Sequence, residues 1–293
     1  MINGDNIKGF WERVVYFAQC IINHYRGSKN SINIKKVTLD PAKVHNFKGA
    51  PSRILCGLFW GTVDWSSISK SLDAPLHFFD IGCGKGNYSK YTRDLTADCF
   101  GSYVGLDIYK ADSFPPEFEH ILSDAVYADE HLPKETNIIV SQSALEHIKE
   151  DVLMLEKLTS KLSSRGQKFF QIHMIPAPSS LWLYLWHGWR QYSKKNLSSI
   201  EIRLKKINPN VEIFAIPLGG GYSFLTHLFR ITMPLLIFKL KDINKRPYIL
   251  GESPLLHERI SNAVKKDLLS RSSKYNSFWV LVISSKDTKL ELS

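Results

Sequence analysis

Three glycines at alternate positions follow an apolar run that ends in an acid, in the stretch LHFFDIGCGKG that begins at Leu76. Glycine adopts positive φ angles at little steric cost, and it leaves space beside the backbone for a close partner. Because a tight turn needs only one or two such residues, Gly82, Gly84 and Gly86 together predict a backbone that a ligand approaches closely.

Two carboxylates follow later apolar runs at corresponding places. Asp107 ends the run SYVGLDI, and Asp124 directly follows the run HILS. In a parallel α/β sheet, ligands bind beyond the carboxyl ends of the strands, near the switch in strand order. A carboxylate at that edge can accept hydrogen bonds from a ribose diol, so these strand ends predict a nucleoside-containing ligand.

Hydrophobic patterns around these residues alternate between strand and helix. Strands are predicted at residues 76–81, 102–108, 120–123, 137–142, 167–175, 211–217 and 278–284. Helices are predicted at residues 10–25, 88–97, 147–163 and 255–269. Such alternation indicates βαβ units and an α/β fold with a mostly parallel sheet.

Length, composition and cysteine usage are typical of a cytoplasmic globular protein. The chain has 293 residues, of which 44% are apolar and 23% charged, so it can bury a full core. Its four cysteines form no CxxC pair, which predicts reduced thiols, and there is no basic leader with a cleavage site to indicate export. No Cys, His and Asp residues have metal-ligand spacing, so no metal is predicted.

The net charge of +10 is unevenly distributed along the chain. Residues 49–150 hold 15 acidic and 8 basic side chains, whereas residues 190–246 hold 3 acidic and 11 basic ones. This asymmetry indicates either an anionic partner that meets the flanks of the chain or a surface that Lys and Arg merely solvate.

An apolar stretch at residues 222–240 is long enough to suggest a membrane span. However, Arg230 lies within it, and a charge near the middle of a span costs about 2.5 to 3.5 kcal/mol. A helix that packs on the protein, or that lies in a lipid interface, is predicted instead.

The position of the third glycine argues against a nicotinamide dinucleotide, because that fingerprint needs glycine where Asn87 stands. The segment DIGCGKG at residues 80–86 resembles the cofactor motif of class I S-adenosylmethionine-dependent methyltransferases. YVGLDIY at 103–109 is similar to the second motif of that family, and SDAVYAD at 123–129 to the third. NIIVSQSALEHIKED at 137–151 resembles the fourth-strand segment of its small-molecule branch, type 11.

This resemblance covers residues 76–175 and implies a Rossmann-like fold. The implied sheet is mostly parallel and seven-stranded with an antiparallel final strand, with helices on both faces and accessory helical segments. An N-terminal helical or cap segment is expected at residues 1–70 and a methyltransferase domain at residues 71–293. An acceptor-binding insertion is expected at about residues 176–270.

The resemblance also implies S-adenosyl-L-methionine as the cofactor. The glycine turn would lie against the methionyl moiety, Asp107 would bind the ribose hydroxyls, and Asp124 with Ala125 would contact the adenine edge. Asp80 would orient the turn or hold the amino group through water, and Ser141 would lie on the cofactor side of the acceptor pocket. The expected cofactor-binding residues are Asp80, Gly82, Cys83, Gly84, Gly86, Asp107, Ile108, Asp124, Ala125 and Ser141.

His147 is the candidate catalytic residue. Methyl transfer from a sulfonium needs a base only if the acceptor must lose a proton, and an imidazole after the fourth-strand segment could take that proton near neutral pH. The competing interpretation is that His147 only caps or packs at the start of a helix. A structural role is likewise expected for His173. For His187 a structural role is the first interpretation, and contact with the acceptor is the second.

The run WLYLWHGWRQY at residues 182–192 is the candidate acceptor contact, and it resembles a segment of methyltransferases from bacterial surface-glycan gene clusters. Aromatic faces beside a guanidinium can stack on sugars or bases, and a guanidinium can clamp a phosphate. Tryptophans three to four residues apart could also form the buried stripe of a helix. The candidate substrate-binding residues are Trp186, His187, Arg190 and Tyr192.

O-methylation of a sugar or glycan, lipid-linked or nucleotide-linked, is the predicted activity, because such an acceptor offers both an anionic pyrophosphate and a hydroxyl. One alternative is a lipid or quinone-like metabolite covered by residues 222–240, with contact to a membrane surface. Another is a non-catalytic protein that only binds the cofactor. The flanks contain no recognised RNA-binding module, so nucleic acid is not an expected partner.

Overall fold

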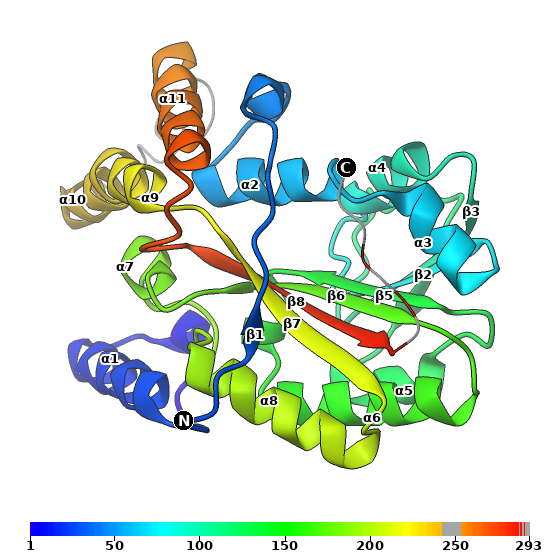
Figure 1. Ribbon diagram of the computed structural model, residues 1–293. Helices are drawn as coiled ribbons and strands as arrows, with labels where there is room; N and C mark the ends of the chain where they lie inside the picture. Colours follow the sequence, from blue (N-terminus) through cyan, green and yellow to red (C-terminus); the bar gives the residue numbers. More distant parts are fainter. Residues whose placement is uncertain (242–252, 287, 289, 291–293) are drawn as a thin grey trace.

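A central β-sheet with helices on both faces forms the body of the protein in the computed structural model, which describes residues 1–241, 253–286, 288 and 290 (Figure 1). The sheet has eight strands in the order β1-β7-β8-β6-β5-β2-β3-β4. Their bounds are β1 Asn33–Ile34, β2 Leu76–Ile81, β3 Phe100–Asp107, β4 Glu119–Leu122, β5 Ile138–Gln142, β6 Phe170–Pro176, β7 Val211–Leu218 and β8 Phe278–Ser285.

The strand directions confirm the predicted fold class. β2 pairs in parallel with β3 and β5, β3 with β4, and β5 with β6, whereas β8 lies antiparallel between β6 and β7. The sheet has one strand more than the seven expected, because β1 adds to its edge in parallel with β7. The strand order changes direction between β2 and β5, and such a switch point is where α/β sheets bind ligands.

The helices form one layer on each face of the sheet (Figure 1). One layer contains α2 (Pro51–Trp60), α3 (Trp65–Leu72) and α4 (Asn87–Leu95), and the other contains α5 (Ala128–His131), α6 (Asp151–Ser164) and α8 (Lys194–Ile207). Successive strand residues point to opposite faces, so the neighbours Phe78 and Phe79 belong to two different hydrophobic clusters. The sheet therefore separates two cores, one under each helical layer.

The N-terminal residues contribute to the same core as the sheet. Leu55 and Phe59 of α2 are fully buried in the cluster that also contains Phe78 of β2. The sequence patterns do not predict α2 or α3 individually, because α2 is apolar almost throughout and lacks a clear helical period. Packing against the sheet, rather than amphipathic spacing, stabilises this helix.

Two further helices differ from the sequence-based expectations. In α8 the buried Leu197, Ile200 and Leu204 have helical spacing, but the surrounding basic composition obscures it. α6 begins at Asp151, four residues later than predicted, because Leu145–His147 forms a separate 3-10 turn. His147 consequently precedes the helix instead of beginning it.

Accessory helices gather at one end of the sheet, beyond the point where β6 ends and α7 begins (left in Figure 1). These helices are α1 (Phe10–Tyr25), α7 (Ser180–Tyr184), α9 (Gly221–His227), α10 (Met233–Lys241) and α11 (Pro254–Ser270). α1 has the bounds that its apolar spacing predicts. The accessory helices thus lie beyond the carboxyl end of β6, on the side where parallel sheets bind ligands.

The apolar residues 222–240 form a bent helical segment that packs on the protein. α9 passes into a π-helical turn, η5 (Leu228–Thr232), and then into α10. Within this segment the side chain of Ile231 is buried against the protein, whereas that of Phe229 is 60% exposed. In the described parts of the chain, no helix combines the length and the apolar character needed to cross a bilayer. Residues 242–252 of the expected insertion lie outside the described residues.

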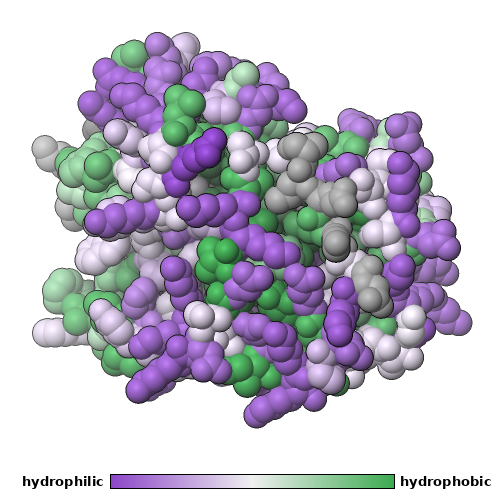
Figure 2. Space-filling view, viewed as in Figure 1, coloured by the Kyte–Doolittle hydropathy of each residue, from purple (hydrophilic) through white to green (hydrophobic). Residues whose placement is uncertain are grey.

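Hydrophobic side chains reach the surface at this end of the molecule. Figure 2 shows them at the left, where α1 and α10 lie. α1 buries Tyr16 and Cys20 but exposes most of its large apolar residues. The exposed ones are Phe10, Trp11, Val14, Val15, Ile21, Ile22 and Tyr25.

Asp267 of α11 should be required for stable attachment of α9. Its carboxylate accepts hydrogen bonds from the backbone N–H groups of Tyr222 and Ser223, at 2.9 and 2.8 Å, and the residue is only 4% exposed. Replacing Asp267 by Ala should lower the free energy of unfolding by about 2 to 4 kcal/mol, because one buried and one partly buried backbone donor lose a charged acceptor. Urea unfolding measures this change. The matched control is Ala at the exposed Glu258 of the same helix, which should cost less than about 0.5 kcal/mol, and equal effects would contradict the prediction.

Candidate functional site

The glycine turn after β2 has the conformation that its sequence predicts. Gly82, Gly84 and Gly86 have φ angles of 73°, 54° and 69°, which other residues rarely adopt. A Cβ atom at Gly82 would lie 2.4 Å from the Cβ of Ala144, and one at Gly86 would lie 2.7 Å from Pro115. At Gly84, by contrast, a Cβ atom would meet nothing within 4 Å. The outer glycines therefore serve packing within the protein, whereas Gly84 borders open space.

Asp107 joins this turn to the end of the neighbouring strand β3. Its Oδ2 accepts a hydrogen bond from the N–H of Gly84 at 2.8 Å, and its Oδ1 accepts one from the N–H of Tyr109 at 3.1 Å. Each carboxylate oxygen keeps a second lone pair, so a ribose hydroxyl could still bind. Ile108 is 73% exposed and offers an apolar side chain at the same edge.

Asp124 and Ala125 follow β4, the next strand of the sheet. Oδ1 of Asp124 accepts a hydrogen bond from the N–H of Val126 at 3.0 Å and so caps the 3-10 turn Ala125–Tyr127. The N–H of Ser123 donates to the carbonyl oxygen of Asp107 at 3.0 Å, which fixes the two strand ends side by side. Asp124 stays exposed at this edge, and its contact with adenine remains a prediction.

Asp80 lies at the end of β2, below the glycine turn, and is only 6% exposed. Burial raises the pKa of Asp80 to about 7, against the opposing effect of the hydrogen bond that it accepts from the hydroxyl of Tyr103. A cavity of about 20 Å³ is lined by Asp80 together with Tyr88 and Gln142. This space suits one water molecule with polar partners, which could link Asp80 to a ligand.

The side chains of two predicted cofactor residues point into the protein. Cys83 is 8% exposed and lies so close to Gly105 that a Cβ atom there would be 2.7 Å from its Sγ. Ser141 is 1% exposed, and its hydroxyl pairs with Nδ1 of His173 at 2.8 Å. The Ser141 hydroxyl is therefore engaged with a core histidine, although Ser141 also lines the small cavity beside Asp80, and its place on the cofactor side of the acceptor pocket stays a prediction. Burial lowers the pKa of His173 to about 3, so this imidazole is a neutral core group.

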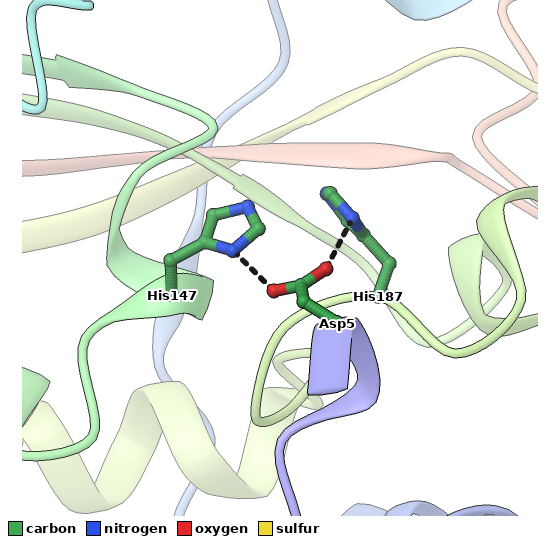
Figure 3. A group of neighbouring side chains, drawn as sticks. All are labelled: Asp5, His147 and His187. Atoms are coloured by element: carbon green, nitrogen blue, oxygen red, sulfur yellow. Dashed lines mark hydrogen bonds and ion pairs between the residues drawn. The ribbon is translucent and has the colours of Figure 1, made fainter. Parts of the chain in front are cut away.

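A carboxylate lies between two histidines beyond the carboxyl end of β5 (Figure 3). Nδ1 of His147 is 2.8 Å from Oδ2 of Asp5, and Nδ1 of His187 is 3.3 Å from Oδ1 of the same carboxylate. The three side chains come from separate segments, namely the 3-10 turn Gly4–Asn6, the turn Leu145–His147 and the loop after α7. The imidazole rings meet edge to face with their centroids 4.5 Å apart. The structure thus brings together His147 and His187, for which the sequence predicts unrelated roles.

Glu146 lies behind this cluster and is almost inaccessible to solvent. It is 1% exposed, and neither of its carboxylate oxygens has a hydrogen-bond partner among the described residues. Oε1 of Glu146 lies 3.9 Å from Nε2 of His187. Because an unpaired polar group is costly to bury, the unbound oxygens of Glu146 require an explanation.

The pKa values of Asp5, Glu146 and His147 are shifted from their ordinary values within this cluster. Burial acts to raise the pKa of Asp5, but hydrogen bonds from His147 and His187 hold it well below its usual range. Burial acts to lower the pKa of His147, but the hydrogen bond to Asp5 and the charge of Glu146 raise it above its ordinary value. Burial also raises the pKa of Glu146. The cluster therefore couples two carboxylates to two imidazoles in a partly dehydrated place.

The remaining candidate acceptor residues bind other parts of the protein. Nη1 of Arg190 lies 3.0 Å from Oδ1 of the buried Asp151, and the hydroxyl of Tyr192 donates to Oδ2 of the same residue at 2.6 Å. Tyr192 is 1% exposed, so its side chain leaves almost no free surface for an acceptor. Trp186 packs edge to face against Phe17 of α1. These contacts show that Arg190, Tyr192 and Trp186 anchor the loop after α7, and their expected acceptor-binding roles stay predictions.

Asp5 and Glu146 are the residues of this region that sequence reasoning missed. Glu146 gives one weak signal, because it is an acid that directly follows the apolar Ala144 and Leu145 and stands next to the candidate His147. Asp5 has no comparable signal, since it lies 142 residues from His147 and joins it only in the folded protein.

No protein-family model matches the chain, and no curated protein matches it either. Among solved structures, the chain is similar to a SAM-dependent methyltransferase from Archaeoglobus fulgidus, with 18% identity, a TM-score of 0.43, and coverage of 74% of this chain and 89% of that one. It is similar to the plantazolicin methyltransferase BamL in complex with a triazolic desmethylPZN analog and SAH, with 14% identity, a TM-score of 0.44, and coverage of 80% and 84%. It is also similar to StiE O-MT, with 12% identity, a TM-score of 0.43, and coverage of 87% and 85%.

Replacing Asp80 by Asn should remove a pH dependence of stability. Because the pKa of Asp80 is raised from 3.8 to about 7 in the folded protein, the folded chain holds this proton more tightly than the unfolded chain. The stability that the protonated group contributes is fully present below about pH 4 and is lost as the pH rises to about 7. Relative to the unmodified protein, the variant should therefore gain about 2 kcal/mol between pH 5 and pH 8 in urea unfolding. Asn at the exposed Asp112 is the control, and a pH-independent difference for Asp80→Asn would refute the assignment.

Proposed function

We propose that this protein is an S-adenosyl-L-methionine-dependent methyltransferase that O-methylates a sugar, a glycan or a related small molecule. The observation that carries this proposal is the open space beside Gly84, at the switch point of the sheet, next to Asp107 and the exposed Ile108. Because Gly84 has a positive φ angle and no Cβ atom, a ligand can come closer to the backbone here than it could at a residue with a side chain.

The groups at the carboxyl ends of β2, β3 and β4 could bind the methionyl, ribose and adenine parts of an adenosyl cofactor, in that order. Asp107 offers lone pairs to ribose hydroxyls, and Ile108 offers an apolar face to the adenine ring. Asp124 lies one strand further out, where it could accept a hydrogen bond from the adenine amino group. Asp80 and its small cavity could hold the amino group of the methionyl moiety through water. The motif resemblance of residues 80–129 supports the same order.

The proposed chemistry is an in-line methyl transfer to a hydroxyl. When bound, the cofactor supplies a methyl group that is already activated, with a neutral thioether as leaving group. The glycine turn and Asp107 would then contribute mainly by positioning, which can supply a large part of the acceleration. The glycine turn lies against Ala144, and three residues after Ala144 comes His147, whose side chain meets Asp5 and His187 in the folded protein. We therefore propose that the acceptor hydroxyl lies between the turn and this cluster, with His147 within reach of its proton.

A groove of about 680 Å³ beside α1 and α7 supports a glycan acceptor. It is lined by Tyr25, Trp182 and Tyr275 and by the cationic pair Lys194 and Lys195. Trp182 and Tyr275 are 52% and 53% exposed; Tyr275 stacks on Phe224 and Trp182 contacts Phe17, so the parts of both rings that stay exposed could still pack against a sugar ring. The lysines could hold a phosphate of a nucleotide-linked or lipid-linked sugar. The volume of this groove lies in the range of known small-molecule binding sites.

A lipid or quinone-like metabolite is the second candidate acceptor. A groove of about 810 Å³ between α9, η5 and α11 combines apolar and cationic side chains, which suits an acyl chain with an anionic head. Together with the apolar face of α1, this groove supports peripheral contact of the expected cytoplasmic protein with a membrane surface. The groove is lined by Tyr222, Leu225, Thr226, Phe229, Arg230, Arg259, Asn262, Ala263 and Lys266.

The activity is tested by incubating the protein with labelled S-adenosyl-L-methionine and a fractionated lysate, followed by mass spectrometry of whatever gains a methyl group. Labelled glycan or lipid-linked sugar would support the first candidate, and labelled free lipid or quinone the second. Calorimetry with the cofactor alone separates binding from transfer. Micromolar binding without transfer to any glycan or lipid extract would instead favour a non-catalytic cofactor-binding protein.

Replacing Asp107 by Ala should weaken cofactor binding by about 1 to 3 kcal/mol, because it removes a charged acceptor that also fixes Gly84. Calorimetric titration with S-adenosyl-L-methionine measures the change. Asp112, an exposed acid in the loop that follows, provides the matched control, and its replacement by Ala should leave the affinity unchanged. An unaltered affinity of the Asp107 variant would show that the ribose binds elsewhere.

Replacing Gly84 by Ala should abolish most cofactor binding without unfolding the protein. The new Cβ atom would occupy the space assigned to the ligand, and the positive φ angle would cost about 1 to 2 kcal/mol of stability. Gly166 has a similar φ angle of 67° and equally open surroundings, but it lies after α6, so its replacement by Ala is the matched control. Both variants should lose similar stability in urea unfolding, and only the first should lose binding. Equal binding by the two variants is the outcome that contradicts the proposed site.

A further inference from the structure

We propose that Asp5, His147 and His187 form a binding site for a divalent transition metal ion of the Zn²⁺ type, supported from behind by Glu146. One carboxylate and two imidazoles are a ligand set that zinc sites use when they keep the fourth position open. The spacing of these residues along the sequence predicts no metal, because the three ligands lie on separate segments that only the fold brings together (Figure 3).

The donor atoms converge as a metal site requires. One ligand atom of each residue lies within 4.8 Å of the others, and both Nδ1 atoms face the same carboxylate, at 2.8 and 3.3 Å. Ligand atoms about 2 Å from a tetrahedral ion lie about 3 to 4 Å from one another. Small rotations of the two imidazole rings would therefore admit an ion between His147, His187 and Asp5.

Glu146 provides the independent observation that favours an ion. Histidines that bind metals through one ring nitrogen almost always donate a hydrogen bond from the other nitrogen to a carboxylate or carbonyl group. His187 directs Nδ1 toward Asp5 and places Nε2 3.9 Å from Oε1 of the buried Glu146, whose oxygens are otherwise unbound among the described residues. If the His187 ring moved by less than 1 Å toward Glu146, its Nε2 could donate a hydrogen bond to Oε1 of Glu146. Glu146 would then have the partner that it lacks.

The charges of the cluster also suit a divalent cation. Asp5 and Glu146 are two carboxylates, and no Lys or Arg forms an ion pair with either of them in the part of the chain that the structure describes. The nearby Arg190 is committed to Asp151. Two protonated imidazoles could balance the charge, but a divalent ion balances it with neutral imidazoles, which are the form that binds metals.

The site is accessible and lies near the proposed acceptor. The side chains of His147, His187 and Asp5 are each about one third exposed, so an ion could exchange with solvent and keep an open position. Resting on the proposed function, an acceptor hydroxyl bound there would become more acidic, which would assist its methylation. His147 would then act as a ligand instead of a base.

Metal binding is tested with the full chain, without an affinity tag, after treatment with EDTA and dialysis. Calorimetric titration with ZnCl₂ should show one ion per chain, and CoCl₂ should produce the visible absorption of a low-coordinate Co²⁺ site. Asp5→Asn, His147→Ala and His187→Ala should each weaken Zn²⁺ binding about 100-fold or more, and Glu146→Gln about 10- to 100-fold. His131→Ala, which removes an exposed histidine of α5, should bind as the unmodified protein does.

Circular dichroism identifies any variant that does not fold, and His187→Gln replaces His187→Ala in that case because it keeps a polar side chain of similar length. The proposal is wrong if the unmodified protein binds no Zn²⁺ at up to ten equivalents, or if the folded variants of Asp5, His147 and His187 bind it unchanged. The titration uses neither cofactor nor acceptor, so its failure leaves the proposed methyl transfer intact. Conversely, absence of methyl transfer with normal Zn²⁺ binding would overturn only the proposed function.

Discussion

The hydrogen bond from the N–H of Gly84 to the carboxylate of Asp107 is the contact on which the candidate site depends. It joins the ends of β2 and β3, two parallel neighbours at the switch point of the sheet. The positive φ angles of the glycine turn direct the backbone toward this carboxylate and keep the opposite side open. Because the register of β2, β3 and β4 fixes the three strand ends, the edge is shaped before any ligand binds.

Most of the fold can be predicted because its main signals are local. β2 has the predicted bounds because it is a short, continuous apolar run that ends at a glycine turn, and α1 has them because its apolar residues recur with the helical period of 3.6. β1 could not be predicted, because two residues carry no period and become a strand only by pairing with β7. The late start of α6 likewise depends on tertiary contacts, since the turn at Leu145–His147 packs Leu145 and Glu146 into the core.

The site was predictable to the extent that its residues are contiguous in the sequence. The glycines with Asp80, and the later Asp107, belong to short motifs whose spacing is set by one strand and one turn. Arg190 and Tyr192 have the right chemistry for an acceptor, but the buried Asp151 binds both, and no sequence pattern reveals such a partner. The cluster around Asp5 was missed for the same reason, because its members meet only when the loop after α7 closes over the end of β5.

Both edges of the sheet are short. β1 has two residues and is followed by Lys35, which pairs with Glu212 of the neighbouring strand, and β4 has four residues. Long, uncharged edge strands expose rows of N–H and C=O groups to which strands of other molecules can add. Here few such groups are available, so continuation of the sheet from one molecule into the next is disfavoured. The protein can therefore expose the apolar face of α1 for interactions of another kind without inviting fibrous association through its strands.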